Sequence, residues 1–171
     1  MPPMGSKEPG AGPGDREAPL GPVSYRFAER GDAAALVTLL QELMADHGVV
    51  SPERDRLLET VDAVLAAGGR HRFLLAETGG GIVGMCAMLF SMSTWSAAKA
   101  CELQDVVVST AARRQGVGRA LVETAERLAQ GEGCRRVFLL AEAWNLDAHA
   151  FYGALGFSEK TCLAFERDLQ A

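Results

Sequence analysis

The stretch from Asp105 to Leu121 holds the residues best suited to binding an anion. The β-branched run Val106–Val108 predicts the end of a strand, and two glycines then open a helical pattern. The first backbone amides of a helix have no internal acceptor and lie at the positive end of its dipole. Glycine lacks the Cβ atom that would keep a ligand away, and three arginines add positive charge: Arg113, Arg114 and Arg119. This pattern indicates a pyrophosphate site.

An ordinary helix start with two chance glycines is the alternative interpretation of the same residues. The stretch is not a Walker loop, because the GxxxxGK[ST] spacing is absent, and it is not a complete GxGxxG dinucleotide motif. The preceding strand and the local positive charge on an acidic chain favour the anion site.

Hydrophobic periodicity and turn residues predict one mixed α/β domain in the order β-α-α-β-β-β-α-β-α-β. A βαβ unit is expected over Cys101–Leu140, and a hairpin turn at Gly79–Gly81. Helices are expected after the caps Asp32 and Ser51, and over Gly116–Gln130 and Asp147–Leu155. The expected strands are Val23–Glu29, His71–Glu77, Ile82–Phe90, Cys101–Ser109, Arg135–Leu140 and Cys162–Leu169.

Composition narrows the classes of function. The 171 residues carry 17 Lys and Arg against 22 Asp and Glu, a net charge of −5, so no broad basic face for nucleic acid or an anionic membrane is expected. No apolar run reaches the length of a membrane span. Residues 1–22 hold six of the seven prolines and are expected to form a disordered tail before a domain over 23–171. Scattered cysteines and histidines favour free thiols, no metal site and a reducing cytoplasmic location.

Two motifs resemble those of a known family. The run Arg113-Arg114-Gln115-Gly116-Val117-Gly118 resembles the [RQ]-x-x-G-x-[GA] signature of the GCN5-related N-acetyltransferases. The segment Asn145–Phe157 resembles the family's second motif, N-x(6)-Y-x-x-x-G-[FY], and the likeness covers about Val23–Leu169. It implies the GNAT (acyl-CoA N-acyltransferase) fold with acetyl-CoA as co-substrate. Arg114 departs from the glycine that the family commonly carries.

The resemblance implies a set of coenzyme contacts. Main-chain groups at the end of the strand would bind the pantetheine arm and the acyl carbonyl, the turn would bind the pyrophosphate, and Asn145 would bind the pantetheine arm. The implied residues are Val106, Val107, Val108, Arg113, Arg114, Gln115, Gly116, Val117, Gly118, Arg119, Asn145 and Tyr152.

The resemblance also implies catalytic roles. Tyr152 matches the tyrosine that protonates the leaving thiolate, although its helical spacing with Phe151 and Leu155 also fits a core tyrosine. Asn145 and Asp147 are both candidate helix caps. Glu102 is the first candidate for the general base, with Asp105, Glu142 or a chain of waters as alternatives. His149 is expected to be a surface residue, and Cys101 a packing residue.

The acceptor expected from the resemblance is a small cationic primary amine that attacks directly in a ternary complex. Sequence phrases resemble the diamine (spermidine/spermine) and aminoalkylphosphonate acetyltransferase branches, although Gln104 replaces a glutamate common in the diamine branch. A protein N-terminus or lysine is the alternative acceptor. A non-catalytic acyl-CoA-binding regulatory module is the alternative function. A homodimer is compatible with the family.

Overall fold

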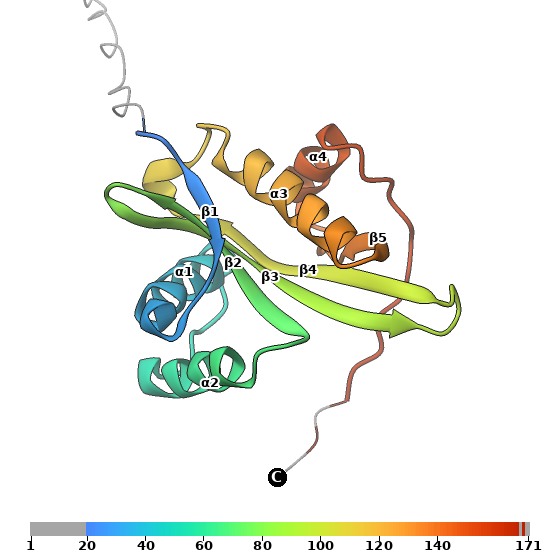
Figure 1. The fold of residues 1–171 in the computed structure, drawn as a ribbon, viewed down its shortest axis with the longest axis horizontal. Coiled ribbons are helices and arrows are strands. Elements are labelled where there is room, and N and C mark those ends of the chain that lie inside the picture. Colours follow the sequence, from blue (N-terminus) through green and yellow to red (C-terminus); the bar gives the residue numbers. More distant parts are fainter. Residues whose placement is uncertain (1–19, 168, 170–171) are drawn as a thin grey trace, which may run out of the picture.

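The computed structural model describes residues 20–167 and 169, so most of the predicted tail, residues 1–19, lies outside the described part. The elements follow the predicted order as far as α4 (Figure 1). No helix in the described part is long and apolar enough to cross a membrane. The elements are β1 (Ser24–Phe27), the 3-10 turn η1 (Arg30–Asp32), α1 (Ala33–Asp46), α2 (Arg54–Ala67), β2 (His71–Thr78), β3 (Gly81–Ser93), β4 (Ala98–Val108), the 3-10 turn η2 (Thr110–Ala112), α3 (Val117–Gly131), β5 (Cys134–Leu139) and α4 (Leu146–Ala154).

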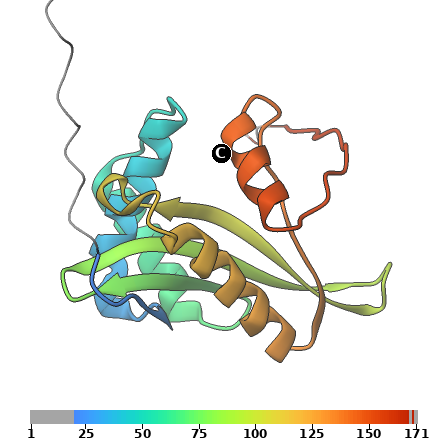
Figure 2. The same cartoon turned by 90° about the horizontal axis from the view of Figure 1, so that it is seen from above.

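The strands form one sheet in the order β1-β2-β3-β4-β5. The first four strands run antiparallel to their neighbours, whereas β4 and β5 are parallel and joined by α3, which confirms the predicted βαβ unit. Helices α1 and α2 cover one face, and α3 and α4 lie over the other (Figures 1 and 2). Each face has its own apolar core, because alternate residues of a strand point to opposite faces.

The sheet opens between β4 and β5. Their pairing ends at Leu103 opposite Leu139, so residues 104–108 of β4 have no partner on the β5 side. Within this free stretch β4 also bulges: Gln104 pairs with Ala87, but Val107 pairs with Met85, so two β4 residues face one β3 residue. The result is a wedge-shaped gap at the carboxyl end of the central strand.

The expected last strand, Cys162–Leu169, is wrong for the part that is described. Residues 162–167 and 169 form no strand, and Leu163, Phe165 and Leu169 are 81%, 91% and 87% exposed. Alternating apolar residues give a segment the propensity for a strand, but a strand also needs a neighbour to pair with. The described part of this segment pairs with no sheet edge (Figure 1).

The two predicted cap residues, Asp32 and Ser51, do not bond to the first amides of α1 and α2 through their side chains. Helix α2 begins after Glu53 rather than at Ser51, whose hydroxyl donates to the carbonyl of Pro52. Asp32 occupies the N-cap position of α1 as predicted, but its side chain makes no bond to the helix amides; its carboxylate accepts from the Glu29 amide at 2.7 Å and from Arg26 at 2.7 and 2.9 Å. Hydrogen bonds from Arg26 hold the pKa of Asp32 below its ordinary value.

Candidate active site

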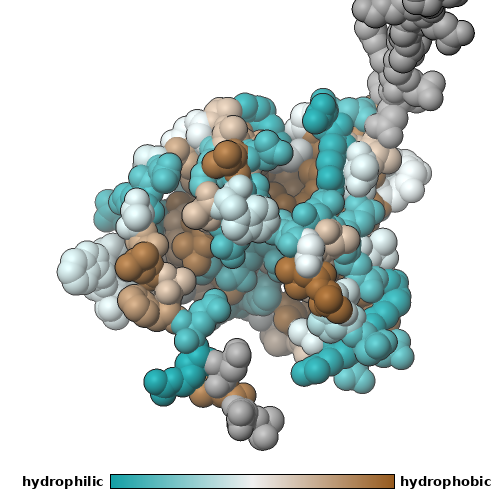
Figure 3. All heavy atoms as spheres, turned by 180° about the vertical axis from the view of Figure 1, so that it is seen from behind, coloured by the Kyte–Doolittle hydropathy of each residue, from teal (hydrophilic) through white to brown (hydrophobic). Residues whose placement is uncertain are grey.

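A groove of about 350 Å³ opens where β4 ends, beside the start of α3 and one side of α4. The face of the molecule turned away from the viewer in Figure 1 is hollowed between the half with α4 and the half with α1 and α2 (Figure 3). The groove brings together eight of the predicted coenzyme contacts: Val106, Val108, Arg113, Arg114, Gly116, Gly118, Arg119 and Tyr152.

The start of α3 offers backbone amides to this groove. Gly116 precedes the helix in a left-handed conformation with φ 83°. The amide of Ala120 bonds to the Gly116 carbonyl at 3.1 Å, so the amides of residues 117–119 come before the first helical bond and lack a helical acceptor. A Cβ atom built at Gly116 would meet no atom within 4 Å, which leaves space for a ligand. These amides and the helix dipole suit a phosphate group.

The three arginines of the turn have different surroundings. Arg113 donates from Nε to the Val108 carbonyl at 2.9 Å and pairs with Asp46 of α1, so its charge is partly neutralised. Arg119 lies 3.5 Å from Glu123. Arg114 forms no ion pair within the described residues. Its φ of 59° is left-handed, the conformation that explains why the family commonly carries glycine there.

Four predicted coenzyme contacts do not line the groove. Val107 faces the core under α1, and Val117, the first residue of α3, is buried in the core between α3 and the sheet. The Gln115 side chain accepts from the Leu20 amide at 2.9 Å and donates to Ala111, so it shapes the turn. Asn145 caps α4, because its side chain accepts from the Ala148 amide at 3.1 Å. That bond decides between the two predicted caps.

The sequence interpretation missed three residues that line the groove: Asp147, Ala148 and Phe151. Their helical spacing with Tyr152 was the available signal, since residues three and four apart share one helix face. Gly118 belongs with them, because a Cβ atom there would contact Phe151 and Val108, each at 3.5 Å. The glycine therefore lets α3 lie close to α4 and β4.

Tyr152 lies half-buried in the groove wall. Its ring packs edge-on against Phe151 and Phe157, with centroids 5.0 and 5.7 Å away. Burial, and to a lesser degree the nearby Cys86 thiol, raises the pKa of Tyr152 to about 12. The phenol is therefore protonated at neutral pH and is available as a proton donor.

The candidate bases occupy different places. Glu102 pairs with Phe138 in the closed part of the sheet, and its carboxylate accepts from Gln104 at 3.0 Å. Asp105 lies at the bulge with φ 48°, two residues beyond the last β4–β5 pair. Its pKa is raised by burial among surrounding protein atoms, although His71 nearby acts in the opposite direction. Glu142 lies exposed in the loop between β5 and α4.

His149 and Cys101, the two other residues considered for catalysis, make contacts within the protein. His149 lies 3.0 Å from the Glu142 carbonyl through Nε2. Cys101 is buried, and burial raises the pKa of its thiol to about 12, which suits a packing residue rather than a nucleophile. Within residues 20–167 and 169, no three His, Cys, Asp or Glu side chains gather closely enough to hold a metal ion.

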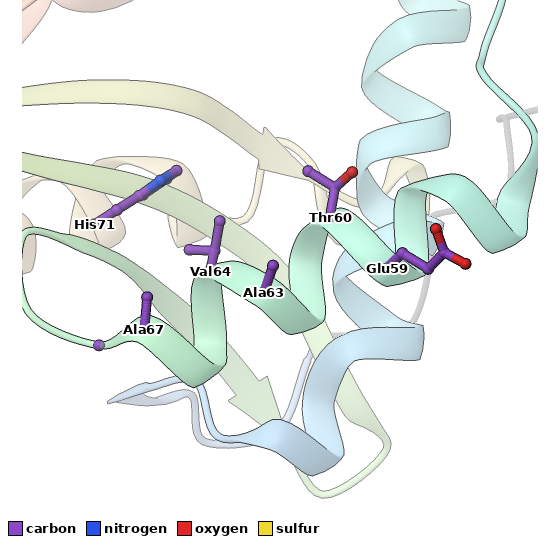
Figure 4. Close-up of a pocket in the computed structure, with 7 residues that line it drawn as sticks. Glu59, Thr60, Ala63, Val64, Ala67 and His71 are labelled. Carbon is purple, nitrogen blue, oxygen red and sulfur yellow. The ribbon is translucent and has the colours of Figure 1, made fainter.

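A second hollow, of about 530 Å³, lies on the opposite face of the sheet. Figure 4 shows His71 projecting from the start of β2 beside the side of α2 that carries Thr60, Ala63 and Ala67. The Nε2 atom of His71 is buried and has no hydrogen-bond partner in the described part, and burial lowers the pKa of its ring. This hollow is thus lined by α2 and the start of β2, whereas the groove is lined by β4, the start of α3 and α4.

Comparisons with known proteins agree with this geometry. Residues 36–157 match the family described as the Acetyltransferase (GNAT) family. Thialysine N-epsilon-acetyltransferase from Bos taurus is 29% identical over 164 residues, which cover 84% of this chain and 92% of that protein.

Solved structures share the fold. Glucosamine-6-phosphate N-acetyltransferase from Arabidopsis thaliana superposes with a TM-score of 0.69 at 20% identity, over 86% of this chain and 99% of that one. An aminoglycoside acetyltransferase from an uncultured soil metagenomic sample superposes with a TM-score of 0.71 at 18% identity, over 86% of this chain and 97% of that one. The chain belongs to the Acetyltransferase (GNAT) family and is an N-acetyltransferase.

Proposed function

We propose that this enzyme transfers the acetyl group of acetyl-CoA to a primary amine of a small cationic acceptor, by direct attack in a ternary complex. One observation carries the proposal: the free end of β4, the open amides of α3 and Tyr152 all line one groove. Acetyl-CoA has a pyrophosphate for the helix start and supplies the activated thioester. The groove residues fit it, because Gly116 leaves open space beside amides that lack acceptors.

Each part of the groove has one task in this reaction. The amides of residues 117–119 and Arg114, which forms no ion pair within the described residues, bind phosphate oxygens. Beyond the last β4–β5 pair, the backbone groups of residues 106–108 that face the gap have no β5 partner, and those other than the Val108 carbonyl, which accepts from Arg113, orient the pantetheine arm and donate to the oxygen on which charge develops. Tyr152 donates its proton to the departing thiolate.

We favour Asp105 over Glu102 as the base that takes the proton of the acceptor amine. Asp105 lies at the open gap, whereas Glu102 lies in the paired part of β4 and is bonded to Gln104. Asp105 is exposed to solvent, yet partial desolvation by the surrounding protein raises its pKa, which makes its carboxylate a stronger base than an unperturbed one. Glu102 stays the alternative base. If Asp105 is the base, its substitution lowers kcat and that of Glu102 does not; if Glu102 is the base, the reverse holds.

The acceptor is proposed to approach from the α1–α2 face of the sheet. The hollow beside α2 lies there, with the Glu59 carboxylate and His71 on its border. An acidic border suits a cationic amine, and the relative from Bos taurus is named for thialysine. A protein N-terminus or lysine stays the alternative acceptor.

The test measures thiol release from acetyl-CoA with a panel of amines that includes thialysine, spermidine and a lysine peptide. Asp105→Asn should lower kcat by roughly 10²-fold or more, the scale of lost acid–base catalysis, without weakening CoA binding. Glu102→Gln and Glu142→Gln test the two alternative carboxylate bases, and a loss of kcat confined to Asp105→Asn supports Asp105. CoA binding without thiol release for any amine would instead support the non-catalytic module.

A further inference from the structure

His47, the residue directly after α1, contacts the loop before α4, and Figure 2 shows the end of α1 and α4 on the same side of the molecule. Its Nε2 lies 3.4 Å from Nδ2 of Asn145, and its ring meets Trp144 edge-on at 5.5 Å between centroids. Helix α1 packs on one face of the sheet and α4 on the other. The contact therefore spans the open side of the gap between β4 and β5.

The partners of this contact have complementary hydrogen-bonding roles. Nδ1 of His47 lies 2.9 Å from the Leu43 carbonyl, which only accepts, so Nδ1 carries the proton and neutral Nε2 is the acceptor. The Oδ1 atom of Asn145 accepts from the Ala148 amide, so its NH2 group is the one that faces His47. A continuous chain of donors and acceptors thus joins the end of α1 to the first turn of α4.

Helix α4 depends on such end contacts. It has nine residues, none of them is fully buried, and only partly buried side chains such as Phe151 and Tyr152 pack it against the core. Tyr152 lies seven residues after Asn145, about two helical turns along the same side. A shift at the start of α4 therefore moves the Tyr152 hydroxyl relative to the groove.

The end of α1 is itself anchored beside the coenzyme turn. Glu42 accepts from the Thr110 amide at 3.3 Å, and Asp46 pairs with Arg113, which holds the Val108 carbonyl. His47 thus connects the loop before α4 to the end of α1, which is itself bonded to the turn after β4.

We propose that His47 is a positioning residue for acetyl transfer, which acts through Asn145 and Trp144 to hold α4 and to aim the Tyr152 hydroxyl into the groove. The proposal rests on the proposed function, because it assigns Tyr152 the proton transfer. His47 itself does not exchange a proton with the substrates. Its contribution is to kcat, and it leaves acetyl-CoA affinity unchanged.

The kinetic test uses two substitutions that separate the acceptor atom from the ring. His47→Gln keeps an acceptor near the place of Nε2, whereas His47→Phe keeps a ring against Trp144 but removes the acceptor. With acetyl-CoA and the best amine of the panel, His47→Phe should lower kcat roughly 2- to 10-fold, the effect of one neutral hydrogen bond. KM for acetyl-CoA should not change, and His47→Gln should recover most of kcat.

A double-mutant cycle decides whether His47 acts through Tyr152. In a Tyr152→Phe background, His47→Phe should have no further effect on kcat. An equal fractional loss in both backgrounds would overturn the proposal, as would wild-type kcat in folded His47→Phe.

A spectroscopic test needs no acceptor. Trp95 is fully exposed in the turn between β3 and β4, so Trp95→Phe leaves Trp144 as the single indole of the chain. Adding His47→Ala should lower the fluorescence anisotropy of Trp144, because its partner ring is lost. Unchanged anisotropy would overturn the bridge even where activity falls. Absence of turnover in the wild type would overturn the proposed function, and the anisotropy would still decide whether His47 holds the loop.

Discussion

Substitution of Gly116 tests the placement of the coenzyme pyrophosphate. Gly116 has φ 83°, and the left-handed region costs a residue with a Cβ atom about 1–2 kcal/mol. No atom lies within 4 Å of the added Cβ, so Gly116→Ala carries no further steric penalty in the free protein. For a chain of this size that loss lowers Tm by roughly 2–8 °C.

The effect on coenzyme binding is expected to be larger. The new methyl group enters the space beside the helix amides, and one lost hydrogen bond to a charged phosphate is worth about 1.5–3 kcal/mol. CoA should therefore bind roughly 10- to 100-fold more weakly, measured by isothermal titration calorimetry. Gly116→Val, with its branched Cβ, should weaken binding further.

Gly131→Ala is the matched control. Gly131 ends the same helix, its φ is not left-handed, and a Cβ atom there also meets nothing within 4 Å. This variant should bind CoA normally and melt no lower than wild type. Normal CoA affinity in folded Gly116→Val would refute the assignment of the pyrophosphate to the start of α3.

Two other predictions concern protonation. Tyr152→Phe should lower kcat roughly 10²-fold with unchanged CoA affinity, and a wild-type rate would remove Tyr152 from the chemistry. Since the pKa of Tyr152 is raised from 10.0 to about 12, this phenol should show little tyrosinate absorbance at pH 10 in a Tyr25→Phe background, and the free energy of unfolding should fall as pH rises from about 10 to about 12. The pKa of Asp32 is lowered by Arg26, so its contribution to stability should be lost as pH falls below about 4. Asp32→Asn should lower the free energy of unfolding by roughly 1 kcal/mol in urea at pH 7 and by less at pH 3, and equal losses at both would contradict the ion pair.

Local patterns in the sequence were enough to predict most elements. The period of apolar residues marked α3 and α4, and the βαβ unit followed because a parallel pair needs a crossover. The glycines and arginines of 113–119 marked the anion turn, since helix-start chemistry depends on neighbours in the chain. The homodimer and the cytoplasmic location stay predictions.

Other features needed the folded chain. The described residues from Cys162 onward form no strand. A strand forms only where the chain reaches a sheet edge, and alternating apolar residues alone do not determine whether it does. The pairing of Arg113 with Asp46 neutralises a charge that the sequence suggested was free for phosphate.

The sequence by itself determined most of the elements and the chemical groups near the groove, because propensity and glycine conformations are local properties. Tertiary structure alone decided which groups meet. The bulge that places Asp105 at the gap depends on pairing with β3, and the contact of His47 with Asn145 joins residues 98 positions apart. Such contacts arise from the packing of two layers on one sheet, which no spacing along the chain encodes.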